Sequence, residues 1–262
     1  MFPKLISIGH FFLPTYGVFV ALGFLAGLWI TLRLARRAGL PNEPITNLAI
    51  YCALAGLAGA KIFMILFDLD EYVKDPGSIF SFGTLQAAGV YQGGFLLAIV
   101  VAIWYMRRHK LPMLETCDVF APGIAAGHVL GRLGCFAAGC CFGTECDRPW
   151  AVMFTNPEAH NLVGVPLGVP LHPTQLYEAF TELLIFGILY WQVRRPHAAG
   201  ETFGLYLVLY SVARFIVEFF RFHEQGLHWG LSITQWISLA TLVAGIWLLL
   251  YRRHAPKLVS AV

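Results

Sequence analysis

Long apolar runs separated by short polar stretches dominate the pattern of this chain. A helix needs roughly 20 apolar residues to cross a bilayer, and the apolar runs come close to that length. They lie at about 15–35, 46–67, 88–106, 118–138, 175–192, 203–222 and 234–251. The pattern therefore predicts an all-α polytopic membrane protein, in which residues 1–262 form a single domain of seven transmembrane helices.

Basic residues in the short loops predict the orientation of these helices, because Lys and Arg concentrate in cytoplasmic loops. They follow every odd-numbered segment: Arg33, Arg36 and Arg37; Arg107, Arg108 and Lys110; Arg194 and Arg195; Arg252, Arg253 and Lys257. In contrast, the loop at about 143–172 contains only Arg148. We therefore expect the N-terminus outside, the C-terminus in the cytoplasm and the 143–172 loop on the extracytoplasmic side.

Composition narrows the class of protein further. Hydrophobic residues make up 58% of the chain and charged residues 13%, whereas soluble domains have about a quarter charged. The first apolar run lacks the basic start and small-residue cleavage site of a secretory signal, so we expect it to remain as a helix. A nucleic-acid partner is not expected, because the sequence shows no basic face interleaved with exposed aromatic residues.

Charged residues within the predicted helices are the main functional signal. Arg132, Arg214 and Lys61 fall in the outer halves of the fourth, sixth and second segments. An arginine at the bilayer centre costs about 2.5–3.5 kcal/mol on insertion scales. One interpretation is a polar cavity for an anionic lipid head group, since Arg grips phosphate with two parallel donors. The other is structural pairing or snorkelling: Glu218 can pair with Arg214 at i, i+4, but Arg132 and Lys61 lack an obvious partner.

Other polar residues are predicted at the same outer side of the membrane. Tyr16 begins the first segment, Gln92 the third and Gln235 the seventh. The stretch "HPTQLYE" opens the fifth segment with His172, Gln175, Tyr177 and Glu178. It reads either as a hydrogen-bonding shelf at the cavity mouth or as a helix start, with Thr174 as cap, Pro173 in the first turn and Tyr177 as interfacial anchor.

Small residues recur at close to four-residue spacing in the fourth segment, at Gly123, Gly127, Gly131 and Ala138. A face of small residues lets membrane helices approach closely. We therefore expect this helix to be central and packed on several sides.

Four cysteines follow this segment in the spacing C-x4-C-C-x4-C, at Cys135, Cys140, Cys141 and Cys146. Zinc and iron–sulfur sites typically pair their cysteines as C-x2-C. The spacing thus favours packing or a disulfide, for example between Cys146 and one neighbour, over a metal site or a reactive thiol. No metal site is predicted.

Several short motifs lie in a fixed order along the chain. The stretch "GRLGCFAAGCCFG" is similar to the signature of the bacterial prolipoprotein diacylglyceryl transferases, which begins Gly-Arg-x-Gly-Asn-Phe and ends in Gly. Further segments resemble the family in the same order along the chain: "YG" at 16–17, "YQGG", "DRPWAVMF", "HPTQLYEA", "RFIVEFFR" and "LSITQWIS". The resemblance covers nearly the whole chain, and the family also has seven spans with the N-terminus outside.

This resemblance implies a reaction and its partners. The family transfers the diacylglyceryl group of phosphatidylglycerol, a membrane lipid, to the lipobox cysteine thiol of preprolipoproteins. A thioether forms and glycerol phosphate leaves, without a metal or organic cofactor. The implied location is the bacterial cytoplasmic (inner) membrane, as a multi-pass protein whose site faces the outer leaflet.

The resemblance also implies roles for individual residues. Arg132 and Arg214 match the family's essential arginines and would grip the phosphate, while Glu218 would orient Arg214. The residues expected to hydrogen-bond the glycerol or the leaving group are Tyr16, Gln92 and Tyr210. The further residues expected to contact substrate are Lys61, Gly131, Gly134, Gly143, His172, Gln175 and Gln235.

Several positions depart from the family pattern. Gln92 stands where the family has a histidine proposed as a catalytic group, and Gln cannot take up a proton at neutral pH. Cys135 replaces the signature asparagine, Cys140 the later acidic residue, and Lys61 a frequent arginine. The phosphate-binding part of the mechanism is retained, whereas the base for the thiol is left unassigned. The alternative from another class is a non-catalytic protein that binds or moves phospholipid on the same scaffold.

Overall fold

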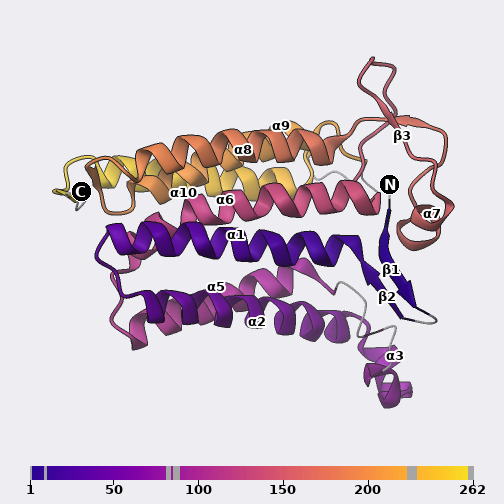
Figure 1. The fold of residues 1–262 in the computed structure, drawn as a ribbon, viewed down its shortest axis with the longest axis horizontal. Helices are drawn as coiled ribbons and strands as arrows, with labels where there is room; N and C mark the ends of the chain where they lie inside the picture. Colours follow the sequence, from indigo (N-terminus) through magenta and orange to yellow (C-terminus); the bar gives the residue numbers. More distant parts are fainter. Residues whose placement is uncertain (1, 9–10, 81–83, 85–88, 223–228, 259–262) are drawn as a thin grey trace. The chain divides into compact units, whose positions relative to one another are not determined.

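A computed structural model of the chain describes all residues except 1, 9–10, 81–83, 85–88, 223–228 and 259–262 (Figure 1). The chain divides into two compact units. One comprises Met1–Gly39 with Cys117–Val262, and the other comprises Leu40–Thr116. Each unit is described on its own below.

Long helices cover most of each predicted apolar segment. Within the described residues, seven helices have 18 or more residues: α1 (Thr15–Arg37), α2 (Asn42–Phe67), α5 (Tyr91–Arg108), α6 (Met113–Ala138), α8 (Thr174–Gln192), α9 (Glu201–Glu218) and α10 (Ile233–Arg252). Their ends differ from the predicted ends by up to about five residues, as expected of boundaries read from sequence.

Four of these helices, α1, α2, α6 and α10, are long and apolar enough to cross a membrane, judged by length and composition over the described residues. Large apolar side chains are exposed on them, such as Leu57 at 70% and Trp247 at 63%. A water-soluble protein rarely exposes contiguous apolar surface of this extent. The protein is therefore a mostly helical membrane protein.

Glycines set the contact between α1 and α6 in the first unit. A Cβ atom on Gly23 would lie 2.7 Å from the carbonyl oxygen of Gly127, and one on Gly27 would lie 2.6 Å from that of Gly123. The two backbones thus approach more closely than any side chain allows, which confirms the expected close packing at Gly123 and Gly127. Gly131 differs, because a Cβ atom there would meet nothing within 4 Å. The packing role predicted for Gly131 is therefore wrong.

The second unit uses the same device between α2 and α5. A Cβ atom on Gly59 would lie 2.5 Å from the carbonyl oxygen of Gly93, and one on Gly94 would lie 2.5 Å from that of Gly56. This unit also contains two short helices that the apolar pattern did not predict, α3 (Leu69–Lys74) and the 3-10 helix η1 (Pro76–Phe80).

Helices α6, α8 and α9 of the first unit enclose a small apolar core. It is formed by Ala121 and Ala125 of α6, Ile185 and Leu189 of α8, and Tyr206 of α9. Helix α9 packs against both α8 and α10. This core fixes the relative positions of α6, α8 and α9, which carry most of the buried charges.

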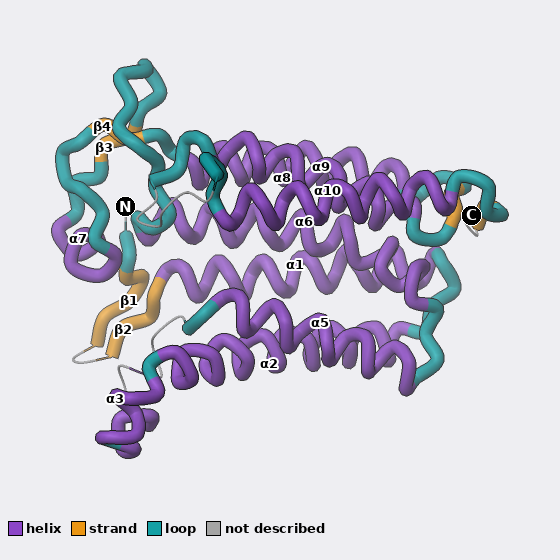
Figure 2. The backbone as a smooth tube through the Cα atoms, turned by 180° about the vertical axis from the view of Figure 1, so that it is seen from behind, coloured by secondary structure: helices purple, strands orange, loops and turns teal. Residues whose placement is uncertain are grey.

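Short strands and one short helix complete the first unit. Three antiparallel pairs are present among the described residues: β1 (Lys4–Ile8) with β2 (Phe11–Pro14), β3 (Val152–Met153) with β4 (Pro170–Leu171), and β5 (His197–Ala198) with β6 (Lys257–Leu258). The predicted 143–172 loop contains β3, β4 and α7 (Pro157–Val163). Figure 2 shows β3, β4 and α7 at one end of this unit's helices and the C-terminus at the other. These strands are additions to the predicted all-α architecture.

Candidate active site

Two neighbouring helices of the first unit carry a ladder of buried charges. Arg132 Nη2 lies 2.8 Å from Glu178 Oε2, and His128 Nδ1 lies 2.9 Å from Glu182 Oε1. Each pair joins α6 to α8, and within each helix the two residues are four apart. Since the later residue on α6 meets the earlier one on α8, the helices are antiparallel. Arg132 was expected to lack a partner; the structure corrects this, because Glu178 is its partner.

A hydrogen bond joins the two rungs of this ladder. The Nε–H of Arg132 donates to Nε2 of His128 over 3.2 Å. Nε2 therefore accepts, which leaves the ring proton on Nδ1 to donate to Glu182. The imidazole is thus held in one tautomer between a carboxylate and a guanidinium.

A second arginine shares the Glu178 carboxylate. Arg221 Nη1 lies 3.6 Å from Glu178 Oε1, whereas Arg132 contacts Oε2 of the same carboxylate. Glu178 is almost fully buried, with 5% of its side chain exposed. Buried carboxylates are costly unless paired, so the two cations account for the charge of Glu178 inside the protein.

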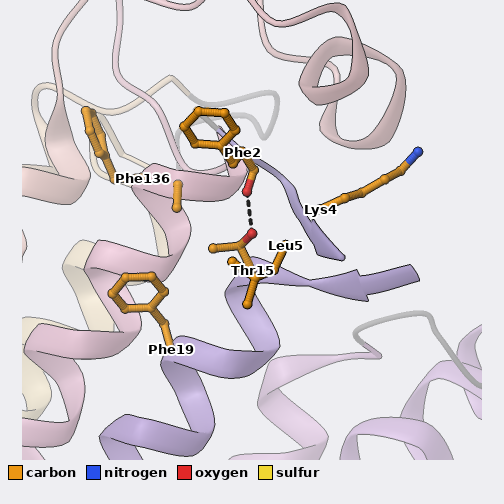
Figure 3. A pocket seen from close by; sticks show the side chains of 7 residues that line it. Phe2, Lys4, Leu5, Thr15, Phe19 and Phe136 are labelled. Carbon is orange, nitrogen blue, oxygen red and sulfur yellow. Dashed lines mark hydrogen bonds between the residues drawn. The ribbon is translucent and has the colours of Figure 1, made fainter. Parts of the chain in front are cut away.

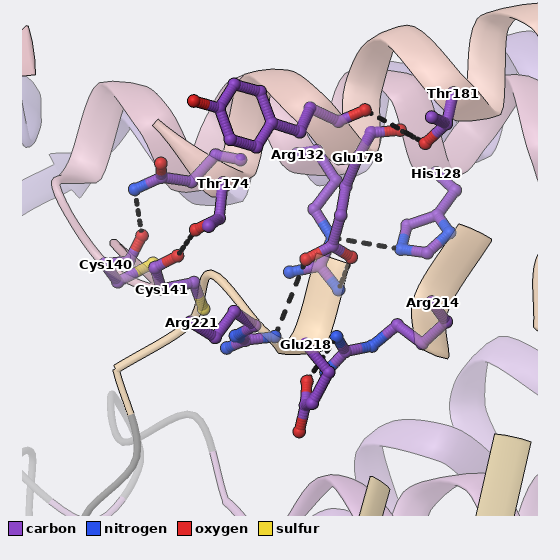
Figure 4. Close-up of polar contacts among 12 residues, drawn as sticks. His128, Arg132, Cys140, Cys141, Thr174, Glu178, Thr181, Arg214, Glu218 and Arg221 are labelled. Atoms are coloured by element: carbon purple, nitrogen blue, oxygen red, sulfur yellow. Dashed lines mark hydrogen bonds and ion pairs between the residues drawn. The ribbon is translucent and has the colours of Figure 1, made fainter. Parts of the chain in front are cut away.

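Arg214 and Glu218 form a neighbouring cluster on α9. Their ion pair, Nη1 to Oε2, measures 2.5 Å, so the predicted i, i+4 pair is confirmed. Ser232 Oγ donates to the other oxygen of Glu218 over 2.8 Å. In Figure 4 the guanidinium groups of Arg132, Arg214 and Arg221 gather around the Glu178 and Glu218 carboxylates. The three basic groups therefore meet in one polar region.

Gln235 is engaged in helix capping rather than facing this region through its amide oxygen. Its side-chain Oε1 accepts from the backbone N–H of Ser232 over 3.0 Å, and the backbone N–H of Gln235 donates to Ser232 Oγ over 3.1 Å. This capping box starts α10. Because Ser232 also donates to Glu218, the cap positions the acidic partner of Arg214.

Both predicted tyrosines, Tyr16 and Tyr210, lie beside residues of α6. The Tyr210 ring centroid is 5.7 Å from that of His128. Tyr16 lies in the first turn of α1, where a Cβ atom on Gly134 would lie 3.4 Å from its ring. The same Cβ atom would lie 2.8 Å from Phe19, so Gly134 is required for the close contact between α6 and the start of α1.

Three separate chain segments form the backbone frame next to the ladder. Gly143 donates its N–H to the carbonyl of His172, and Thr144 donates to that of Phe220, each over 2.9 Å. A Cβ atom on Gly143 would collide with both of these carbonyl oxygens. Gly143 is thus placed by close backbone packing, directly beside the segment that carries Arg221.

Side chains of the "HPTQLYE" stretch form hydrogen bonds with other parts of the protein. His172 Nδ1 lies 3.0 Å from the Tyr177 hydroxyl, which also accepts from Trp150 Nε1 over 2.8 Å. Gln175 is fully buried and donates to the carbonyl of Cys140 over 2.7 Å. The predicted capping role of Thr174 is wrong: Thr174 begins α8, and its hydroxyl donates to the carbonyl of Cys141.

Lys61 and Gln92 belong to the second unit. Lys61 Nζ donates to the carbonyl of Thr84 over 2.5 Å, and Gln92 is exposed in the first turn of α5. Lys61, like Arg132, was expected to lack an obvious partner, and the Thr84 carbonyl supplies one. Any part that these two residues play beside Arg132 stays a prediction.

All six cysteines are free thiols, so the suggested disulfide at Cys146 is not formed in this structure. The Sγ atoms of Cys135, Cys140 and Cys141 lie within 4.8 Å of one another. Contacts with the other two thiols, and the charges of Arg221 and Arg132, lower the pKa of Cys141 below its ordinary value. Its neighbour Cys140 has a raised pKa, because it remains the protonated donor in the same cluster.

An apolar pocket lies near the start of α1 and the C-terminal end of α6. It has a volume of about 500 Å³ and is lined by Phe2, Lys4, Leu5, Thr15, Phe19, Phe136 and Ala137 (Figure 3). Thr15 donates a hydrogen bond to the carbonyl of Phe2, which closes one wall. The pocket therefore borders the same part of α1 and α6 as Tyr16 and Gly134.

Four members of the polar cluster were not predicted as site residues: His128, Glu178, Glu182 and Arg221. A signal was present for the first three, since His128 and Arg132 are four apart on one predicted helix and Glu178 and Glu182 are four apart on another. When two helices with this spacing lie antiparallel, each basic residue of one helix can meet an acidic residue of the other. Arg221 lay at a predicted helix end, where sequence alone gives no partner.

Known proteins resemble this chain over almost its full length. Residues 3–251 match the family described as prolipoprotein diacylglyceryl transferase. Proteins named phosphatidylglycerol–prolipoprotein diacylglyceryl transferase are similar to it in several bacteria. The one from Clostridium tetani is 32% identical over 88% of this chain and 90% of its own. The Sodalis glossinidius protein is 31% identical over 98% and 96%, and the Ruegeria pomeroyi protein 34% over 97% and 96%. With the motif order and the paired arginines in agreement, this chain belongs to the prolipoprotein diacylglyceryl transferase family.

Proposed function

We propose that this protein transfers the diacylglyceryl group of phosphatidylglycerol to the lipobox cysteine thiol of preprolipoproteins. The thiol sulfur bonds to the diacylglyceryl carbon, the bond from that carbon to the phosphate oxygen breaks, and glycerol phosphate leaves with the electron pair. Family membership and the names of the relatives support this reaction. The observation that carries it is the convergence of Arg132, Arg214 and Arg221 in a buried region of a membrane protein.

Arg132 and Arg214 bind the lipid phosphate in this proposal. Their side chains are 15% and 10% exposed, so a phosphate reaching them leaves water behind and interacts strongly. Each guanidinium has five N–H donors, and the carboxylate contacts use part of them. The phosphate therefore shares Arg132 with Glu178, and Glu218 holds Arg214 in place. Charge that develops on the departing phosphate is stabilised by donors already in position.

The remaining candidate residues surround the glycerol and the leaving group. Tyr16 and Tyr210 supply hydroxyl groups at the α1 and α9 sides of α6, and the substrate contacts of Gln92 and Lys61 stay predictions from the family resemblance. The backbone frame at Gly143, His172 and Gln175 holds the segments that carry the arginines. Gly131 leaves open space next to Arg132, because a Cβ atom there would meet no neighbour within 4 Å.

His128 takes the role of the thiol's base. Gln92 cannot accept a proton at neutral pH, whereas Nε2 of His128 presents a lone pair, currently to Arg132, and Glu182 steadies the ring from the other side. When Arg132 turns its donors toward the phosphate, Nε2 becomes available to accept the proton of the thiol. This arrangement of base and orienting carboxylate is the one that other nucleophile-activating sites use.

The proposed topology has seven spans, with the N-terminus outside and the C-terminus in the cytoplasm of a bacterial inner membrane. The alternating Lys and Arg clusters support it. It places the outer end of α6, and therefore the site, toward the outer leaflet. A preprolipoprotein that has crossed the membrane then meets the lipid on the correct side.

The test is lipidation by the purified protein in nanodiscs that contain phosphatidylglycerol, with a lipobox peptide as acceptor. We expect a mass increase equal to one diacylglyceryl group, and none with a Cys→Ser peptide or with phosphatidylethanolamine alone. Arg132→Ala should lower the rate roughly 100- to 1,000-fold, as loss of a transition-state donor does. The matched control is Arg33→Ala, which removes a cation outside the cluster.

Complementation provides the cellular counterpart. A strain depleted of its own transferase should be rescued by the wild type and by Arg33→Ala, but not by Arg132→Ala. If the wild type reaches the membrane at a normal level yet neither rescues growth nor lipidates the peptide, the proposal fails and a non-catalytic lipid-binding role is supported instead.

A further inference from the structure

Three cysteines that are close in the sequence lie together at the C-terminal end of α6. Cys135 lies in the last turn of the helix, and Cys140 and Cys141 follow its end. Their Sγ atoms all lie within 4.8 Å of one another, while Cys146 stays outside the group. We propose that Cys135, Cys140 and Cys141 together bind one soft metal cation, Zn²⁺ or Cu⁺.

The spacing of the sulfur atoms suits such an ion. A Zn–S bond of about 2.3 Å places the sulfurs of a three-thiolate site about 3.8–4.0 Å apart, for tetrahedral and trigonal arrangements respectively. The observed separations, all within 4.8 Å, need to shorten by at most about 1 Å to reach that range. Thiolate ligands select Zn²⁺ and Cu⁺ over harder cations. Three protein ligands satisfy trigonal Cu⁺, or leave one position of tetrahedral Zn²⁺ open to an outside ligand.

The backbone that carries the thiols is held by other parts of the protein. Gly139, with φ +85°, ends α6, and the N–H groups of Gly139 and Cys140 both donate to the carbonyl of Cys135. Cys141 follows in a left-handed conformation, with φ +60°. That conformation is uncommon for residues other than glycine and persists where the surroundings enforce it.

Two buried residues of α8 provide this enforcement. Gln175 donates to the carbonyl of Cys140 over 2.7 Å, and Thr174 donates to that of Cys141 over 2.8 Å. Both side chains are fully buried. The vicinal thiols are therefore directed back toward Cys135 before any ion arrives, which reduces the entropy lost on binding.

The local charge also favours the bound state. Three thiolates with one Zn²⁺ carry a net charge of −1, which is costly in a buried setting unless it is offset. The positive charges of Arg132 and Arg221 act on the Cys141 sulfur. The same two arginines are shared with Glu178, so the ion would sit at the edge of the polar cluster without replacing any of its ion pairs.

Spacing rules did not indicate this site, because C-x4-C-C matches no common zinc motif. The structure brings Cys135 next to the later pair through the sharp chain reversal at Gly139. The proposed ion has no part in the implied lipid transfer, so its test does not depend on that reaction.

The experiment measures metal in the purified, reduced protein, prepared in detergent without chelator. We expect about one equivalent of zinc or copper by elemental analysis. After removal of the ion, Co²⁺ added as a Zn²⁺ probe should produce the visible bands of sulfur-ligated cobalt, and a Cu⁺ chelator competition should reveal any preference for copper. Cys141→Ser should weaken binding roughly tenfold or more, since even outer-shell partners of metals contribute 10- to 100-fold.

Cys146→Ser is the matched control, because Cys146 is a buried cysteine of the same loop but lies outside the cluster. It should bind metal as the wild type does. Size-exclusion profiles verify that each variant is folded. The proposal is overturned if the reduced wild type takes up neither Co²⁺ nor Cu⁺, if the thiols pair as a disulfide that excludes metal, or if Cys146→Ser loses as much binding as Cys141→Ser.

Discussion

At the scale of single residues, the cost of burying charge explains most of the site. Arg132, Arg214 and Arg221 each lie within ion-pair distance of a buried carboxylate. Isolated cations of this kind are expensive inside a membrane, whereas paired cations need only small additional favourable contacts. The glutamates therefore allow the arginines to be present, and the arginines in turn are the groups suited to a phosphate.

This reasoning predicts a large stability effect for one isosteric substitution. Glu178→Gln removes the charge shared by Arg132 and Arg221 and leaves both cations buried, so we expect a loss of about 3–5 kcal/mol, typical of a broken buried ion pair. Thermal unfolding in detergent measures it. Combined with Arg132→Gln, the two losses should be non-additive by roughly 0.5–3 kcal/mol.

The chain offers a matched control for that experiment. Glu158 pairs with Lys4 at 2.9 Å, but its side chain is 52% exposed. Exposed pairs contribute about 0–1 kcal/mol, so Glu158→Gln should barely change the unfolding temperature. Equal effects of Glu158→Gln and Glu178→Gln would contradict the view that burial makes the ion pairs of Glu178 contribute more to stability than an exposed pair.

At the scale of elements, one glycine of α1 and one of α6 separate a packing role from a functional role. We expect Gly27→Ala to destabilise the protein by about 1–3 kcal/mol, because its Cβ atom would press on the carbonyl of Gly123. Gly131→Ala should leave stability unchanged or raise it slightly, since the new methyl group meets nothing and Ala is the better helix former. Unfolding temperatures of the two variants test this.

Gly131→Ala carries a second expectation, for activity. If the space beside Arg132 accommodates the lipid, this variant should remain folded and lose lipidation activity. Retained stability together with wild-type activity would show that the glycine serves neither packing nor substrate.

A buried histidine in the connection between α8 and α9, His197, is expected to make the stability of the protein depend on pH. Asp118 accepts the N–H groups of Gly200 and Phe203 over 2.6 and 2.8 Å, and lies 3.6 Å from His197 Nε2. Burial lowers the pKa of His197, but the Asp118 carboxylate and the carbonyl of Arg195 outweigh burial and raise it above the ordinary value of 6.5. Folding therefore raises the affinity of His197 for its proton.

The sign of the effect follows from linkage. The stabilisation is fully present below pH 6.5 and is lost as the pH rises through the raised pKa of His197. We expect the unfolding temperature of the wild type to fall over that range. His197→Gln should flatten this part of the profile, and a profile that keeps its slope in the variant would assign the effect to another group.

At the scale of the whole molecule, topology is the prediction that remains open to a direct test. Fusions of alkaline phosphatase and of a fluorescent protein report the periplasmic and cytoplasmic sides. We expect fluorescence after residue 110 and after the C-terminus, where basic residues concentrate. Phosphatase activity is expected after residue 147, in the loop poor in basic residues. The opposite pattern at residue 147 would place the site on the wrong side for an exported substrate.

Much of the helical structure could be predicted from the sequence, because hydrophobic length acts locally. Apolar runs of bilayer length become helices wherever their neighbours lie, since backbone groups in lipid must be satisfied within the segment. The i, i+4 pair of Arg214 and Glu218 and the close-packing glycines Gly123 and Gly127 follow from helical periodicity alone. The family was identified separately, from the resemblance of the ordered motifs.

Tertiary structure decided which distant groups meet. The sequence by itself could not pair Arg132 with Glu178 or His128 with Glu182, since those contacts depend on α6 and α8 being antiparallel neighbours in one register. It could not bring Cys135 to Cys140 and Cys141, because that requires the chain reversal at Gly139. Periodicity fixes which face of a helix a residue lies on, whereas only packing determines what that face meets.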